Sequence, residues 1–190
     1  MFLSFMPDTK DDLTKRAFDS VKENDIDALR ACLLEGFDLM TVRKTDATYY
    51  EKFLGMPDQI EDTVASLALK ECLAYDTHWA FLRYLFDNYN PREILENPAA
   101  AFKKSVLLEG LLWEDLGDKT FESSDKHFCL WQVFRGNVDD MVSVARGSPL
   151  ATGGLFNKAN SVNLFLFFKN CIMLDEKNNL KKPPKAQQSM

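Results

Sequence analysis

The sequence has few residues that interrupt helices and few that favour strands. Its 190 residues include 8 Gly and 7 Pro, together about 8%, against about 12% in average proteins. Isoleucine occurs 4 times and valine 9 times, whereas leucine occurs 25 times. This composition argues against a β-sandwich or a β-barrel and predicts an all-α fold.

Residues typical of catalytic and metal sites are also scarce. The chain has 2 His and 4 Cys, and it contains no C-x-x-C pair, phosphate-binding glycine loop, nucleophile elbow or zinc-protease motif. We therefore predict no cofactor, no metal site and no catalytic residue. An enzyme with an unrecognised Cys/His site, either Cys72 with His78 or His127 with Cys129, remains the alternative. All four cysteines lie in apolar stretches, which predicts buried, reduced thiols in a cytoplasmic protein.

Long hydrophobic runs are missing as well. The most apolar segment, residues 162–174, is interrupted by Lys169 and Asn170 and is shorter than the roughly 20 residues that span a bilayer. The apolar N-terminus lacks the basic region of a signal peptide. We expect no membrane span, and a helix over 158–174 that is buried in its own fold or in a partner. A self-assembling structural protein that uses this helix as an oligomer interface is a second alternative.

The net charge of −6 is unevenly distributed. Residues 1–150 contain 17 Lys and Arg against 27 Asp and Glu, whereas residues 151–190 contain six Lys and two acids. An acidic body repels a phosphate backbone, so we expect no nucleic-acid partner. We expect the basic segment 176–190 to be a disordered, solvated tail.

Apolar spacing and helix-ending residues predict a series of short helices. Asn24 and Asp25 separate the first two helices, and Gly36 is placed to end the second in the left-handed conformation. The predicted helices cover residues 10–23, 26–35, 48–54, 59–74, 78–88, 99–113, 125–135, 138–146 and 158–174.

Residues 15–40 resemble the helix–turn–helix unit of an ankyrin repeat. The matching positions are Ala17, Val21, Asn24, Asp25, Ile26, Leu29, Leu33, Gly36 and Asp38. Residues 127–147 repeat this pattern around Gly136 and Asn137, and residues 69–89 form a looser copy. The equivalent positions Ile26, Trp79 and Val138 are 53 and 59 residues apart, whereas a regular ankyrin array repeats every 33 residues.

The resemblance implies one domain over residues 1–175, built from stacked helical hairpins with helical insertions. An α-hairpin array of another family is the alternative. It also implies non-catalytic binding of another protein by a concave, partly acidic face, and therefore a partner with a basic surface. Short, divergent ankyrin-like proteins of this kind resemble bacterial proteins that act on other proteins, such as effectors, effector regulators or toxin inhibitors. An effector would be delivered to a host cell.

Large aromatic side chains that lie outside the apolar stripes of the predicted helices are candidate anchors for that partner. Tyr49, Tyr50 and Phe53 lie in the insertion between the first two hairpins. Trp113 ends a helix beside an acidic loop, and Phe121 lies in that loop. The alternative is that these side chains fold back to fill gaps in an irregular stack.

Overall fold

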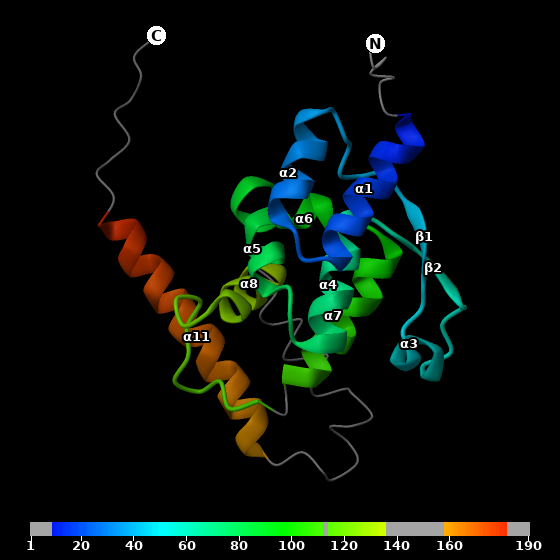
Figure 1. The fold of residues 1–190 in the computed structure, drawn as a ribbon. Helices are drawn as coiled ribbons and strands as arrows, with labels where there is room; N and C mark the ends of the chain where they lie inside the picture. The colour runs from blue at the N-terminus through cyan, green and yellow to red at the C-terminus, as the bar shows by residue number, and fades with distance from the viewer. Residues whose placement is uncertain (1–8, 112–113, 136–157, 182–190) are drawn as a thin grey trace, which may run out of the picture. The chain divides into compact units, whose positions relative to one another are not determined.

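The structure is a computed structural model that describes residues 9–111, 114–135 and 158–181 (Figure 1). The described chain is mostly helical and includes a two-stranded antiparallel sheet. The predicted all-α class is therefore confirmed in general, and the sheet is an addition to it. The chain divides into two compact units, residues 1–107 and 108–190, where the sequence predicted a single domain over 1–175.

Most of the described elements belong to unit 1. They are α1 (Lys10–Lys22), α2 (Ile26–Leu34), β1 (Arg43–Asp46), α3 (Tyr49–Phe53), β2 (Gln59–Asp62), α4 (Val64–Tyr75), α5 (Trp79–Asn88) and α6 (Pro91–Ile94). Helix α7 (Pro98–Leu111) begins in unit 1 and ends in unit 2. Unit 2 also contains α8 (Asp125–Phe134) and α11 (Lys158–Leu180).

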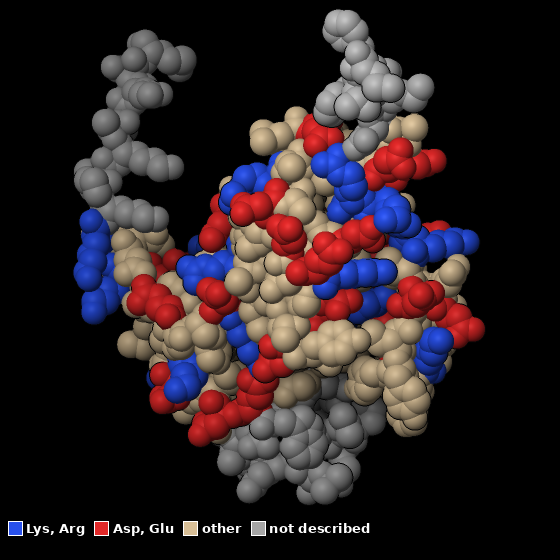
Figure 2. Space-filling view, viewed as in Figure 1, with Lys and Arg blue, Asp and Glu red and all other residues tan. Residues whose placement is uncertain are grey.

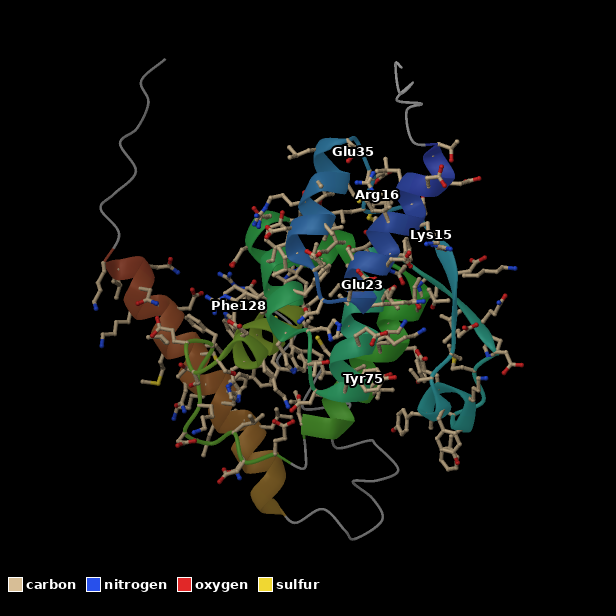
Figure 3. The ribbon with its side chains drawn as sticks, viewed as in Figure 1. Lys15, Arg16, Glu23, Glu35, Tyr75 and Phe128 are labelled. Carbon is tan, nitrogen blue, oxygen red and sulfur yellow. The ribbon has the colours of Figure 1, made fainter. Side chains whose placement is uncertain are left out.

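Helices α1 and α2 form the first predicted hairpin. The Asp25 side chain caps α2 by accepting a hydrogen bond from the amide of Ala28 at 2.9 Å. Gly36 ends this helix with φ +94°, and the Phe37 amide bonds back to the Cys32 carbonyl, as in a Schellman cap. Arg16 of α1 donates two hydrogen bonds to the Glu35 carboxylate, at 2.8 and 2.9 Å (Figure 3). Local sequence signals therefore define this hairpin correctly.

Helix α4 is the central element of unit 1. It packs against α1, α5 and β2, and its buried positions occur on nearly every side of the helix. A helix with several packed faces shows little amphipathic periodicity. The buried residues of α4 are Val64, Ala65, Ser66, Leu67, Ala68, Leu69, Lys70 and Cys72.

The prediction of one helix over residues 59–74 is wrong for its first turn. Residues 59–62 form β2, which pairs with β1 so that Lys44 lies opposite Glu61 and Thr45 opposite Ile60. Burial alternates along β2, and Ile60 and Asp62 are the buried positions. A single apolar residue gives little period-two signal in the sequence, so the strand could not be distinguished from a helix start.

Aromatic side chains form much of the packing in unit 2. Trp131 of α8 stacks on Phe121 with ring centroids 6.0 Å apart, and it also lies beside Phe168 of α11. Phe168 makes edge contacts with Phe134 and Phe167. These contacts cover one face of α11 and leave another face exposed.

Helix α11 continues to Leu180, past the predicted end at residue 174. Residues 176–180 are therefore helical, whereas we expected a disordered tail from residue 176. The predicted helix 138–146, its turn at Gly136 and Asn137, and the end of the tail from residue 182 lie outside the described residues.

Candidate functional site

Helix α3 lies in the connection between β1 and β2, and it carries exposed aromatic side chains. Tyr49 is 86% exposed, Phe53 is 76% exposed and Tyr50 is 47% exposed. We name these three side chains the α3 aromatic surface. In Figure 2, uncharged side chains project at the lower right, at the place that α3 has in Figure 1. Three of the five predicted partner-binding residues are thus brought together on one exposed turn.

Local hydrogen bonds fix the conformation of this turn. Thr48 accepts a hydrogen bond from the Glu51 amide at 3.2 Å, and Glu51 Oε2 accepts from the Thr48 amide at 2.7 Å. This reciprocal arrangement is a capping box. Gly55 then reverses the chain with φ +82°, a backbone conformation that favours glycine.

A buried ionic cluster attaches α3 to the interior of unit 1. It contains Glu51 of α3, Asp62 of β2, Lys70 of α4 and Lys103 of α7, each at least nine-tenths buried. Lys103 donates a hydrogen bond to Asp62 Oδ1, and Lys70 Nζ lies 3.1 Å from Asp62 Oδ2. Two carboxylates and two ammonium groups give the cluster no net charge.

Asp62 is the best-partnered member of the ionic cluster. Its Oδ2 accepts from the Thr45 hydroxyl at 2.5 Å, and its Oδ1 accepts from the Ser66 hydroxyl at 2.7 Å. Lys70 also donates to the Thr45 hydroxyl and to the Asp46 carbonyl, at 2.8 and 2.9 Å. The sheet is therefore bound to α4 through polar groups that water does not reach.

Burial by itself would raise the pKa of the Asp62 carboxyl. The neighbouring Lys103 ammonium, the Thr45 hydroxyl and Lys70 outweigh burial, so the pKa of Asp62 lies below its usual value. Burial lowers the pKa of Lys103, against the attraction of Asp62 and Glu51 for its charged form. Asp62 is thus the ionised centre that holds both lysines.

Glu51 is held less tightly than Asp62. Its carboxylate oxygens lie 3.7 Å from Lys70 Nζ and 3.8 Å from Lys103 Nζ, which is beyond hydrogen-bond distance. Among the described residues, Glu51 Oε1 has no hydrogen-bond partner. The attachment of α3 therefore combines a strong local cap with a long-range charge attraction.

The other two predicted partner-binding residues do not join this surface. Phe121 is partly buried and stacks on Trp131 in unit 2, so it packs inside its own unit. This corresponds to the alternative in which an inserted aromatic side chain fills a gap. Trp113 lies outside the described residues.

The four cysteine side chains are buried in the structure, as the sequence predicted. Burial raises the pKa of the Cys171 thiol to about 12, which disfavours the reactive thiolate.

The two histidines lie at helix starts. His127 Nδ1 is 2.7 Å from the Ser124 hydroxyl that caps α8, and the His127 ring lies beside Phe167. His78 has φ +68° immediately before α5, with Nδ1 2.6 Å from the Thr77 hydroxyl. In the part of the chain that the structure describes, no cluster of three or more His, Cys, Asp or Glu side chains could hold a metal ion.

Sequence reasoning missed the buried ionic cluster. Glu51, Asp62, Lys70 and Lys103 are far apart in the chain, so no local pattern joins them. One signal was available, because Lys70 follows the apolar run Leu67-Ala68-Leu69 in a segment otherwise rich in core residues. A lysine in such a run requires either exposure or a buried partner.

None of the described helices combines the length and the apolar character needed to cross a membrane. No family model, curated protein or solved structure matches this chain. The class that the fold defines is a mostly helical protein, and the ankyrin resemblance stays a prediction.

Proposed function

We propose that this protein binds another protein, with the α3 aromatic surface as its anchor. The observation that carries the proposal is the exposure of Tyr49, Tyr50 and Phe53 on a capped turn that is attached to the core by buried Glu51. Large aromatic side chains supply a major part of the binding energy in protein interfaces. A turn that is already ordered loses little conformational entropy on binding.

The charge of unit 1 indicates the chemistry of the partner. Residues 1–107 contain 13 Lys and Arg against 19 Asp and Glu, a formal net charge of −6, whereas residues 108–190 have none. Around α3, the exposed acids Asp46, Asp58 and Glu61 are mixed with the exposed bases Lys44 and Lys52, and Lys52 pairs with Asp58 at 3.0 Å. The partner would present an apolar pocket for the aromatic side chains and, to complement the net charge of unit 1, a basic surface elsewhere.

We infer that the supporting scaffold is a stack of helical hairpins similar to ankyrin repeats. The contacts of α1 with both α2 and α4, and of α4 with α5, support this inference. In such a stack each hairpin covers the apolar face of its neighbour. The segment β1–α3–β2 would then be an insertion between two hairpins. The sequence assigns Tyr49, Tyr50 and Phe53 to such an insertion.

The test is affinity capture from the native organism with matched variants. The binding variant replaces Tyr49 and Phe53 with serine. The control variant replaces Tyr75 and Leu34 with serine, since these are 67% and 84% exposed elsewhere on unit 1. We expect the wild type and the control variant to capture the same protein in equal amounts, and this capture should weaken as salt is added. The binding variant should not capture that protein. Equal capture by both variants would contradict the proposal.

A further inference from the structure

The exposed face of α11 carries a stripe that is complementary to itself. Four large apolar side chains on this helix are 39% to 88% exposed: Phe165, Ile172, Met173 and Leu180. Two exposed charged residues, Lys169 and Glu176, lie among them. With 100° of rotation per residue, these six positions fall within about 100° of the helix surface. We name them the α11 stripe.

The opposite face of α11 accounts for the packing of unit 2. Leu164, Phe167, Phe168 and Cys171 are buried, and the rings of Phe167 and Phe168 contact aromatic residues of α8. The α11 stripe takes no part in those contacts. An amphipathic helix needs one apolar stripe to pack on its own fold, so a second stripe indicates a second packing partner.

The order of residues in the α11 stripe identifies that partner. Successive members are 4, 3, 1, 3 and 4 positions apart, so the spacing is the same from either end. When two copies of the helix lie antiparallel about the midpoint between Ile172 and Met173, Phe165 is level with the partner's Leu180 and Ile172 with the partner's Met173. Lys169 is then level with the partner's Glu176.

In this arrangement, opposite charges face each other and apolar side chains face apolar side chains. The antiparallel pair contains two Lys169–Glu176 pairs, one on each side of the two-fold axis. Apolar residues face each other at all the remaining levels. A parallel pair would instead place lysine level with lysine and glutamate level with glutamate. A two-fold interface of this kind uses the same surface on both copies.

We propose that the α11 stripe is the interface of an antiparallel homodimer of this protein. From Phe165 to Leu180 the helix rises about 22 Å at about 1.5 Å per residue. An interface confined to this length is smaller than a standard protein–protein interface. The dimer is accordingly a weak one that forms and dissociates with protein concentration.

Charge reversal in the full chain, measured by analytical ultracentrifugation from micromolar to near-millimolar concentration, tests the pairing. Lys169→Glu and Glu176→Lys each convert both opposite-charge pairs into like-charge pairs, and we expect each to weaken association about tenfold. The double variant restores two opposite-charge pairs and should regain wild-type association. Leu34→Glu, a change at an exposed position of α2, should leave association unchanged.

Cross-linking tests the direction of the two helices. A cysteine at position 165 should not link to itself through a short bismaleimide, because its two copies lie about 22 Å apart. A mixture of Phe165→Cys and Leu180→Cys chains should give the mixed dimer. The native thiols are all buried and should react slowly.

A wild-type chain that stays monomeric throughout the concentration range would overturn the proposal. So would a double charge variant that associates no better than the single variants, or efficient self-linking of Phe165→Cys. Circular dichroism of each variant confirms that the exposed substitutions leave the helices formed.

Discussion

Replacing Asp62 with asparagine should destabilise unit 1 by about 3 to 5 kcal/mol. Asp62 is fully buried and faces two buried lysines. The substitution preserves the shape of the side chain but removes its charge. Lys70 and Lys103 would then have only the more distant Glu51 to balance them, and the cluster would carry an uncompensated positive charge.

The hydrogen-bond geometry explains why asparagine cannot replace aspartate here. Oδ1 accepts from Ser66 and Lys103, and Oδ2 accepts from Thr45. An amide nitrogen is a donor, so whichever side it occupies it meets another donor. The predicted loss is a large fraction of the roughly 5 to 15 kcal/mol that stabilises a typical domain.

The pKa of the Asp62 carboxyl predicts how this loss of stability depends on pH. Because the pKa of Asp62 is lower in the folded protein than its usual value of 3.8, its charge stabilises the fold at pH values above that. This contribution is lost as the pH falls through the folded pKa. The difference in free energy of unfolding between wild type and Asp62→Asn should therefore be full at neutral pH and should shrink below about pH 4.

Urea unfolding followed by far-UV circular dichroism measures these differences. The matched control is Asp58→Asn, because Asp58 is exposed and forms an ion pair with Lys52 at 3.0 Å. Such a surface pair contributes at most about 1 kcal/mol. Adding Lys103→Met to Asp62→Asn restores a neutral cluster, so the double variant should lose less than the sum of the two single losses.

The reasoning would be refuted if Asp62→Asn cost no more than Asp58→Asn. Strictly additive losses for Asp62→Asn and Lys103→Met would likewise refute the claim that these two groups form one ionic unit.

Two further predictions concern the helix end and the thiols. Gly36→Ala should destabilise the first hairpin by about 1 kcal/mol, because alanine resists the left-handed conformation, although an added Cβ meets nothing within 4 Å; an unchanged urea midpoint would contradict this. The native cysteines should react slowly with a maleimide reagent at neutral pH and rapidly after unfolding, since all four are buried. A fast native thiol at Cys72 or Cys129 would instead favour the alternative of a Cys/His enzyme.

The first hairpin shows what local sequence can predict. Its two helices, the Asp25 cap and the left-handed Gly36 follow from contacts within a few residues, which is why their bounds agree with the structure within a residue. Tyr49, Tyr50 and Phe53 were selected because they lie outside any apolar period, but the sequence left open whether they fold back, and only the structure shows that they are exposed. Phe121 stacks on Trp131, a packing partner that no local pattern in the sequence indicates.

The sequence by itself determined a mostly helical chain with buried thiols and an aromatic insertion. Only the tertiary structure decided that residues 59–62 form a strand, because that strand depends on pairing with residues 43–46. Tertiary structure also decided the placement of Glu51, Asp62, Lys70 and Lys103. Charges so far apart in the chain become partners only when helices and sheet bring them into a space without water, where each needs the others.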